Sequence, residues 1–547
     1  MYYTNKPIEK TVAPLCENPS KEIVNLLKGL PIHAIDEKEF FDNPGERAGR
    51  NHDTSFTMLT DGVFSPDKIF ENKEWFRFNR GGGRIVTFKL PCLSSVSSFS
   101  ISCLRLDSMG IRTPRYLKVR VSADGENFMT VYNNEDSRTT RDHRIHKLTG
   151  EFAPVQALYV QFVFEVLQHV FMDEIELFGC TDISDAAVPV ANDIPLFHDD
   201  PDPEFVGEYP AEDVLGAKNI ALSYNYRPVA EDKGLKTVDD YLPLMAYLDK
   251  DGKILDTLMD GVLYLPDVSF DTDSKGAYCA EGWRAYVDSI FTPEKNVDAL
   301  NKTIGIINEA LNTPDYKVAV YYTLLYTFTT HDVFGVLEDG DDPVVFESHA
   351  SRKKGIKWMM DTTIRRHKEG NYNNTELKGF YWFEESLDPC DRYEGELLKF
   401  ACDYAHSLGY KCFWIPYYGA VGCTNWKKFG LDCACMQPNY AFEEMPKQRL
   451  YDTAELAKKV GMCVELEIWK VQEDENGNID NPRHIERLIE YYEVGAETGY
   501  MYAPKMYYFG SAIGNCISNG WKSKNARYRE LYDMTYLYSR NKLEVKK

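Results

Sequence analysis

The chain has few of the features that indicate a nucleic acid or a membrane as partner. Basic residues are scarce, since 62 Lys and Arg stand against 85 Asp and Glu, giving a formal net charge of −23. Nucleic acids and anionic membranes attract basic surfaces. No apolar run is long enough to span a bilayer, and the first residues lack the apolar core of a secretory signal. We therefore expect no nucleic-acid or membrane partner, and a cytoplasmic location unless a signal peptide was removed.

Several catalytic signatures are missing as well. Without a Gly-x-Ser-x-Gly elbow a serine hydrolase is not expected, and the glycines at 81–83 lack the following Lys-Ser/Thr of a phosphate loop. The 13 Cys are odd in number and often lie inside apolar runs, as do Cys402, Cys412 and Cys463. Cys433-Ala-Cys435 has no second pair at zinc spacing. We expect reduced packing cysteines instead of a disulfide framework, no metal and no cofactor.

The composition indicates a folded protein of several domains. The 547 residues are 44% hydrophobic and 13% aromatic, and a chain of this length usually forms two to four domains. Residues 50–180 contain short runs rich in β-branched and aromatic residues, clearest at 84–90, 116–122 and 158–164, with a turn signal at Asp124-Gly125. This pattern predicts a β-sandwich.

Motifs in the same segment resemble discoidin-type, galactose-binding-like domains. They are Leu59-Thr-Asp-Gly62, Trp75 before a strand, the run 119–128 and Asp173-Glu-Ile-Glu-Leu-Phe-Gly179. The resemblance implies a jelly-roll sandwich, and such domains bind sugars, lipids, proteins or nothing. Residues 1–49 then form an N-terminal extension, and 181–215 form a linker because they are rich in Pro and acidic residues, most clearly at 198–203.

From residue 216 to 547, strands alternate with amphipathic helices. The strand candidates are 219–224, 259–264, 317–322, 378–383, 411–415, 433–436, 463–467 and 505–508. About eight βα units predict a (β/α)₈ TIM barrel. A doubly wound open sheet is the competing fold, and it is less favoured because no Gly-rich loop opens the first unit.

Two glutamates in the strand candidate at 463–467 are the strongest functional signal. Val464, Leu466 and Ile468 form one apolar face, so Glu465 and Glu467 point together to the other face. A second acidic pair, Glu384-Glu385, follows the run Gly379-Phe-Tyr-Trp-Phe383. Because active sites of such barrels lie at the carboxyl ends of the strands, we expect all four carboxylates at one end.

Other polar and aromatic residues fall at the same strand ends. Amides, carboxylates and aromatic rings in combination suit a carbohydrate, because rings cover the apolar faces of sugars while amides and acids bond their hydroxyls. The expected substrate-binding residues are Glu384, Glu465, Tyr224, Asn225, Tyr264, Trp382, Tyr417, Tyr418, Gln437, Asn439 and Tyr507.

The placement of the acids resembles that of retaining glycosidases of the best-known barrel clan, which carry the acid/base after the fourth strand and the nucleophile on the seventh. This resemblance implies an acid/base at Glu384 or Glu385 and a nucleophile on the strand of Glu465 and Glu467. Strand parity favours Glu385 as acid/base, because it shares a face with Tyr381 and Phe383. Glu467 is favoured as nucleophile because it lies nearer the carboxyl end of its strand. The chain departs from the clan pattern, because Phe383 and Glu384, and no Asn, precede Glu385. Residues 216–540, with Gly379-Phe-Tyr-Trp382, the Glu-Leu-Glu strand and the run Lys505-Met-Tyr-Tyr508, look like the bacterial family catalogued as domain of unknown function 4855.

The sequence thus favours a glycoside hydrolase that acts on an oligo- or polysaccharide with retention of configuration. A non-catalytic carbohydrate-binding protein on the same scaffold is the main alternative. A structural or adhesion module led by the sandwich is a third possibility.

Overall fold

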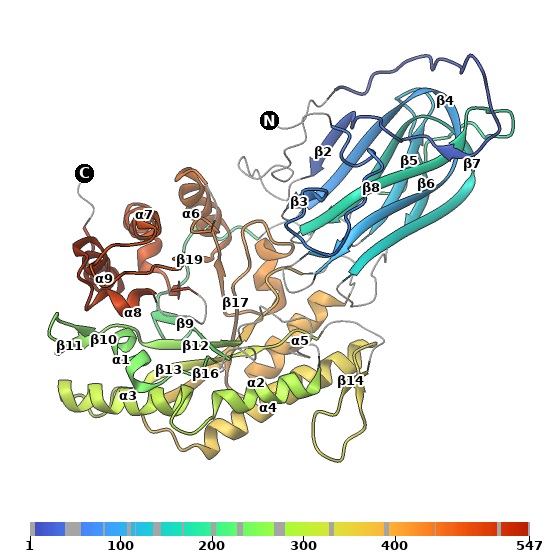
Figure 1. The fold of residues 1–547 in the computed structure, drawn as a ribbon. Helices are drawn as coiled ribbons and strands as arrows, with labels where there is room; N and C mark the ends of the chain where they lie inside the picture. The colour runs from blue at the N-terminus through green and yellow to red at the C-terminus, as the bar shows by residue number, and fades with distance from the viewer. Residues whose placement is uncertain are drawn as a thin grey trace. The chain divides into compact units, whose positions relative to one another are not determined.

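The computed structural model divides the chain into two compact units, one mainly formed by residues 1–200 and one mainly by 201–547. It describes residues 6–38, 56–79, 82–106, 111–114, 116–134, 144–166, 169–197, 204–226, 234–266, 279–327, 333–387, 393–442, 445–510 and 516–544. The 198–203 part of the expected linker therefore lies outside the described residues. Each unit is described by itself below (Figure 1).

The first unit is an antiparallel sheet of eight strands. Its path runs β1-β8-β4-β7-β5-β6, while β2 pairs with β4 and β3 pairs with β8. The strands are β1 Val24–Asn25, β2 Ala34–Lys38, β3 Phe76–Asn79, β4 Gly82–Arg105, β5 Leu117–Ser122, β6 Met129–Asn134, β7 Arg144–Val166 and β8 His169–Cys180. β1 and β2 belong to the first 49 residues, which the sequence analysis set apart as an extension.

Two very long strands give this unit a sandwich-like form. β4 and β7 pair from Gly82↔Val166 to Arg105↔Arg144, with register shifts between Lys89 and Ser94 and between Val96 and Ser98. Such irregularities bend a strand, so the sheet folds over one apolar core that includes Phe88, Phe99 and Phe162. The unit predicted as a β-sandwich is thus sandwich-like and is formed by one continuous sheet of eight strands.

A disulfide in this unit corrects the prediction for the cysteines. Cys16 and Cys92 are bonded across 76 residues, with their Cα atoms 5.3 Å apart. Cys402, Cys412 and Cys463 are free and buried. The expectation of reduced packing cysteines is therefore wrong for Cys16 and Cys92, whereas Cys103 in the same unit is free and buried, like the three cysteines of the second unit.

The second unit contains a closed parallel barrel. Its strands are β9 Asn219–Tyr226, β12 Gly261–Pro266, β13 Val318–Leu324, β16 Thr375–Trp382, β17 Lys411–Trp414, β18 Cys433–Met436, β19 Cys463–Glu467 and β20 Lys505–Tyr508. They are buried and almost continuously apolar, as strands covered on both faces must be. Pairing of β9 with both β12 and β20 closes the ring, which rules out the doubly wound open sheet.

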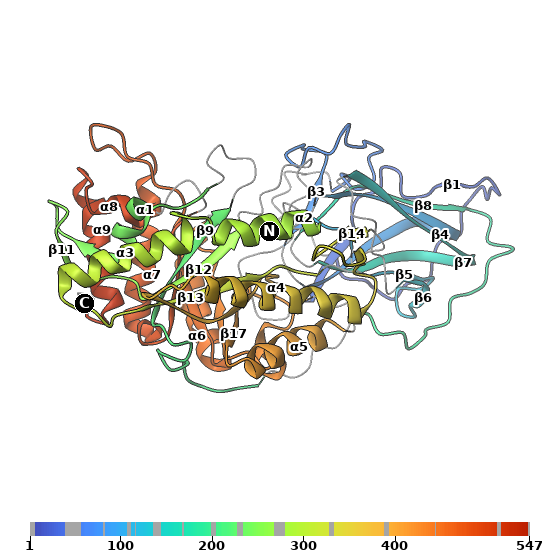
Figure 2. The same ribbon diagram turned by 90° about the horizontal axis from the view of Figure 1, so that it is seen from below.

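Helices and short hairpins occupy the connections between these strands (Figure 2). They are α1 Val238–Met245, α2 Ala280–Ile290, α3 Asn296–Leu311, α4 His349–Glu369, α5 Glu394–Ser407, η3 Cys423–Phe429, α6 Gln448–Val460, α7 Pro482–Thr498, η4 Tyr500–Tyr502, α8 Cys516–Gly520 and α9 Ala526–Ser539. The hairpin strands are β10 Ala246–Leu248, β11 Ile254–Thr257, β14 Val333–Gly335 and β15 Val344–Val345.

The predicted fold class, a regular (β/α)₈ TIM barrel behind a sandwich, is wrong. A regular barrel of that kind carries one α-helix after each strand. Here two helices separate β12 from β13, the hairpin β10-β11 separates α1 from β12, and the described chain between β17 and β18 holds only the 3₁₀ helix η3. Left-handed glycines at 419, 422 and 430 break that last connection into turns. The spacing of the barrel strands was predicted from the sequence, whereas the predicted arrangement with one helix after each strand is not formed.

The described parts of the segment expected to be a linker belong to the folded units themselves, residues up to 197 to the first unit and residues from 204 onward to the second. Asn192 accepts a hydrogen bond from Thr130 N of β6 at 3.2 Å. Val206 N donates to Lys459 O at the end of α6 at 2.8 Å, and Leu215 belongs to the core cluster of the barrel. The predicted domain boundaries themselves stay a prediction.

Candidate active site

Two buried glutamates on β19 form the centre of the candidate site. Cys463, Glu465 and Glu467 share one face of the strand because side chains alternate, and Cys463 belongs to the apolar cluster that fills the barrel. Glu465 is 3% exposed and Glu467 is 0% exposed. Burying two carboxylates is costly unless partners compensate for the lost hydration, so their surroundings decide what each can do.

Glu467 has hydrogen-bond donors on both of its carboxylate oxygens. The Tyr491 hydroxyl of α7 donates to Oε2, and the Asn439 backbone N–H donates to Oε1 at 3.3 Å. Asn439 holds a left-handed φ of 56°, a conformation that asparagine tolerates better than most residues. Donors on both oxygens favour the ionised form of Glu467.

Glu465 lies one layer deeper and has a different environment. Within the described part of the chain its carboxylate makes no hydrogen bond. Burial, then the charge of Glu467, then that of Glu385 raise the pKa of Glu465 well above its usual range. The carboxyl group therefore keeps a proton at a pH where an exposed glutamate would have lost it.

The fourth-strand acids lie at the same end of the barrel. Glu385 follows β16 and is half-buried, and its backbone oxygen accepts from Tyr417 N at 3.3 Å. Its charge contributes, after burial, to the raised pKa of both Glu465 and the buried Tyr381, so its carboxylate lies within electrostatic range of these two groups. Glu384 contributes its backbone oxygen, which accepts from Trp414 Nε1 at 2.6 Å and so fixes the loop. Three carboxylates from two strands are thus electrostatically coupled.

Other predicted residues line the same end. Tyr224 is half-buried and packs against the barrel cluster. The backbones of Tyr417 and Gln437 form an isolated parallel β-bridge. The Gln437 side-chain amide donates to Ile415 O at 2.9 Å. Tyr418 stacks beneath the guanidinium of Arg449, 4.2 Å from its ring centre. These contacts hold the loops after β17 and β18 together.

Asn439 offers a further donor at this position. Its side chain is 8% exposed, and its Nδ2 makes no hydrogen bond in the described part of the chain. An amide nitrogen that is buried without a hydrogen-bond partner destabilises the folded state, because its lost hydration is not replaced. A ligand hydroxyl or carbonyl beside Glu467 would satisfy it.

Four of the predicted binding residues lie on outward-facing positions of their strands. Asn225, Tyr264, Trp382 and Tyr507 alternate with residues of the barrel cluster, and they contact outer parts of the unit. Their partners are Ser289 Oγ for Asn225 Nδ2 (3.4 Å), the Tyr322 ring for Tyr264 (5.9 Å), the Tyr326 ring for Trp382 (6.0 Å) and Asn219 Oδ1 for the Tyr507 hydroxyl (3.1 Å). The structure therefore does not bring these four together with the glutamates.

A row of aromatic rings lies beside the acids, and two of its members, Phe442 and Trp469, were not predicted from the sequence. Tyr508, which pairs with Glu467 across β19 and β20, has its ring centre 5.9 Å from that of Tyr224 and 5.4 Å from that of Phe442. Phe442 in turn lies 5.3 Å from Trp469. Phe442 is 38% exposed and Trp469 is 43% exposed. Strand parity would have selected Tyr508 over Tyr507, whereas Phe442 and Trp469 lie in loops.

The described residues contain neither a membrane-spanning helix nor a cluster of metal ligands. None of the helices in this part of the chain combines the length and the apolar character that a membrane span needs. In the same residues no three His, Cys, Asp or Glu side chains are arranged to hold a metal ion.

The chain belongs to the family described as domain of unknown function (DUF4855). The family model matches residues 219–537, which is more than half of the chain and includes all eight barrel strands. Curated proteins give no match to this sequence.

Solved structures with some likeness include proteins that bind carbohydrates. One is chitosan-binding module 1 of a chitosanase/glucanase from Paenibacillus sp. IK-5, with 17% identity over 28% of this chain and 99% of that chain, at a TM-score of 0.20. Another is CpGH89CBM32-5 from Clostridium perfringens, solved with GalNAc-beta-1,3-galactose, with 15% identity, 26% and 95% coverage and a TM-score of 0.20. A third comprises the CBM22-1-GH10 modules of a Clostridium thermocellum xylanase with xylohexaose, with 9% identity, 85% and 94% coverage and a TM-score of 0.33.

Proposed function

We propose that this protein is a glycoside hydrolase whose active site is the carboxyl end of the barrel. The observation that carries the proposal is the coupled set of Glu385, Glu465 and Glu467, because glycosidic bonds are cleaved by one carboxylic acid and one carboxylate. A purely structural ion-pair pocket would pair buried acids with bases. The described contacts of Glu465 include neither a base nor a hydrogen bond.

The three carboxylates are suited to different roles. Glu467 was the expected nucleophile from its place at the strand end, and no observation tests that assignment directly. Its full burial and its donors on both oxygens favour a supporting role. Glu465 faces the barrel interior with its oxygens unbonded, so we assign the attack on the anomeric carbon to Glu465 and the acid/base role to Glu385.

Repulsion among these groups provides the proton that the reaction needs. Like charges at short range do not ionise together, and the charges of Glu467 and Glu385 both raise the pKa of Glu465. The three carboxyl groups therefore hold at least one proton among them. In the reactive form Glu465 is ionised and Glu385 carries that proton, which it donates to the leaving oxygen while Glu465 forms an ester bond to the anomeric carbon. Glu385 then takes a proton from water, whose oxygen displaces Glu465 and releases the sugar with its configuration retained.

Asn439 and the aromatic row supply the contacts that a sugar requires. Asn439 bonds Glu467 through its backbone N–H, and its side-chain Nδ2, which is buried without a partner in the described part of the chain, would donate to a hydroxyl of the sugar that is attacked. Tyr224 and Tyr508 present ring faces at the same end of the barrel. We propose a neutral oligo- or polysaccharide as the substrate class, since amides and rings, and few cations, surround the acids.

A comparison of matched variants tests this function. Aryl glycosides of common hexoses and pentoses are offered to the parent, to Glu465→Gln and to Glu490→Gln, a control on α7 whose carboxylate bonds Tyr440 and Arg483. We expect hydrolysis by the parent and the control, and a loss of at least about 10³-fold in Glu465→Gln. If the parent binds carbohydrate but cleaves none of these glycosides, the non-catalytic alternative is favoured.

A further inference from the structure

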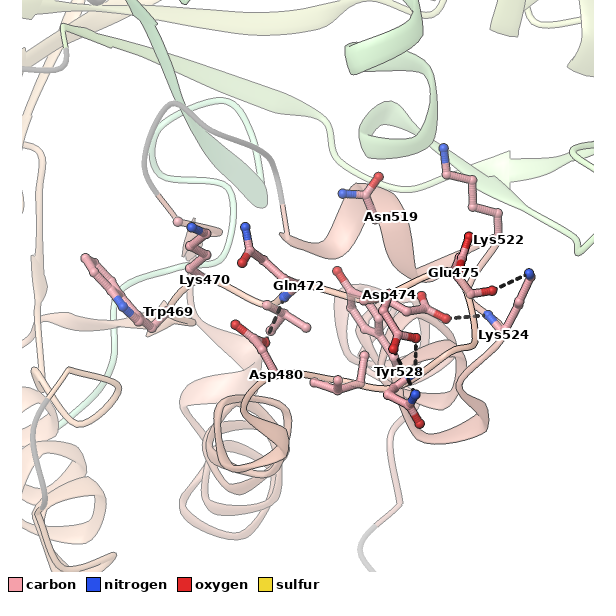
Figure 3. Close-up of a pocket in the computed structure, with 15 residues that line it drawn as sticks. Trp469, Lys470, Gln472, Asp474, Glu475, Asp480, Asn519, Lys522, Lys524 and Tyr528 are labelled. Carbon is pink, nitrogen blue, oxygen red and sulfur yellow. Dashed lines mark hydrogen bonds between the residues drawn. The ribbon is translucent and has the colours of Figure 1, made fainter.

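A pocket of about 1000 Å³ lies beside the candidate active site, in the loops that follow β19 and β20. Trp469 is one of its lining residues, and it follows Glu467 by two positions. Figure 3 shows Trp469 at one end of the drawn side chains and Lys524 at the other. Pockets that hold small ligands usually measure about 300–1,000 Å³, so this one has room for more than one sugar ring.

The aromatic row links this pocket to the barrel carboxylates. Tyr508 is the register partner of Glu467, and successive ring centres lie 5.4 Å apart from Tyr508 to Phe442 and 5.3 Å from Phe442 to Trp469. These rings come from three separate segments, after β18, after β19 and at the end of β20. Successive rings are nearly perpendicular, with interplanar angles of 80° and 89°, and Phe442 and Trp469 are exposed. An extended ligand could therefore stack on these two rings at separate positions along its length.

The acidic residues of the pocket shape its loop. Asp480 Oδ1 accepts from Gln472 N at 2.9 Å, and Asp480 N donates back to Gln472 O at 3.0 Å. Asp474 Oδ1 accepts from Asn478 N at 2.9 Å, and Glu473 Oε1 accepts from Lys524 N at 2.8 Å. The loop is therefore held in place by its own carboxylates before any ligand binds.

Neutral donors and acceptors remain for a ligand. The side-chain amides of Gln472 and Asn519 are exposed in the pocket and make no hydrogen bond within the described residues. The Lys470 ammonium has no carboxylate partner in that part of the chain either. Free amides beside an exposed indole suit hydroxyl-rich sugar rings.

We infer that the pocket is a set of sugar subsites for the same chain that the barrel cleaves, so that the substrate is a polysaccharide cut within its length. This inference rests on the proposed function. The chain would cross the barrel mouth at the glutamates, follow Tyr508 and Phe442, and place further units on Trp469 and between Gln472 and Asn519. A substrate that ended at the cleaved bond would contact neither the aromatic row nor the pocket.

Substrates of two lengths test this inference. The parent, Trp469→Ala and the control Tyr502→Ala are compared on hexasaccharides of glucan, xylan, mannan and chitin, and on the matching aryl monosaccharides. Tyr502 is a suitable control because it is 58% exposed and lies in η4, which precedes β20 and so belongs to the opposite end of the strands. We expect Trp469→Ala to lower kcat/KM roughly tenfold on the best hexasaccharide, as loss of an aromatic contact does, and to stay within about twofold of the parent on the aryl monosaccharide.

The outcomes separate this inference from the proposed function. If Trp469→Ala loses kcat/KM equally on the hexasaccharide and the aryl monosaccharide, or on neither, the inference of sugar subsites is overturned. The proposed hydrolytic function is unaffected by that result. If the parent hydrolyses nothing, calorimetric binding of the same hexasaccharides decides: a roughly tenfold weaker affinity in Trp469→Ala supports the pocket although the enzymatic proposal has failed. A parent that neither cleaves nor binds any of the hexasaccharides contradicts both.

Discussion

Replacing Glu467 by glutamine should move the pH dependence of activity without abolishing activity. Alternate residues on a strand lie about 6.6 Å apart, and two charges at that distance repel by about 2.5 kcal/mol at an effective dielectric constant of about 20. Glu467 is the neighbouring charge that raises the pKa of Glu465 most. Removing that charge lets Glu465 ionise at lower pH, so the acidic limb of kcat/KM should move down by roughly one to two pH units.

The fold should tolerate this exchange. The glutamine oxygen can accept from Asn439 N, and the Tyr491 hydroxyl can turn to accept from the new amide. We expect the maximal rate to stay within about tenfold of the parent.

The assay is the pH profile of kcat/KM on the best aryl glycoside, with Glu490→Gln as a control that should leave the limb in place. An acidic limb that stays fixed or moves to higher pH, or a loss of about 10³-fold or more in a folded Glu467→Gln protein, would refute the assignment of roles. The second result would return Glu467 to the position of nucleophile.

Three further outcomes are expected. Glu385→Gln should lower the rate of hydrolysis of glycosides with poor leaving groups by about 10²-fold or more. Glu384→Gln should stay near the parent rate, because Glu384 holds its loop through its backbone oxygen. Equal losses in the two variants would contradict the assignment of Glu385 as acid/base. Glu465 ionises near its usual pKa of 4.5 in the unfolded chain and keeps its proton to higher pH when folded. The free energy of unfolding of the parent should therefore fall as pH rises above about 4.5, and that of Glu465→Gln should fall less. If urea unfolding gives the two proteins the same pH dependence over this range, the prediction of a buried, protonated Glu465 is contradicted. Arg352→Leu should lower the free energy of unfolding by about 3–5 kcal/mol, since Arg352 Nη2 lies 3.0 Å from Glu394 Oε2 and both residues are 2% exposed. Replacing both residues by leucine should restore most of this loss. A loss below about 1 kcal/mol in Arg352→Leu would contradict the prediction.

The barrel strands could be located from the sequence because local signals specify them. Runs such as Val318–Leu324 and Cys433–Met436 are short and largely apolar, and turns precede them. Alternation along β19 also identified Glu465 and Glu467 as facing one way. The connections could not be inferred in the same way, because whether a segment becomes one helix, two helices, a hairpin or a 3₁₀ turn depends on packing that the segment does not encode alone.

The differences between the predicted set of site residues and the set that the structure brings together have similar causes. Tyr507 was chosen where parity favours Tyr508, and Asn225, Tyr264 and Trp382 were chosen for their place at strand ends without regard to the face on which they lie. Tyr491 could not have been found, because its α7 position is brought to Glu467 only by tertiary packing. The Cys16–Cys92 bond spans 76 residues and has no local signal either.

The most direct test of the account is to find where a sugar becomes attached to the protein. A slowly hydrolysed aryl glycoside is incubated with the parent, the reaction is stopped with acid, and the peptide that contains residues 461–469 is fragmented in a mass spectrometer. A glycosyl mass on Glu465, absent from Glu465→Gln, is the predicted result. If the glycoside is consumed while the adduct lies on another residue, or while no adduct forms on either β19 glutamate, the proposed covalent mechanism is contradicted.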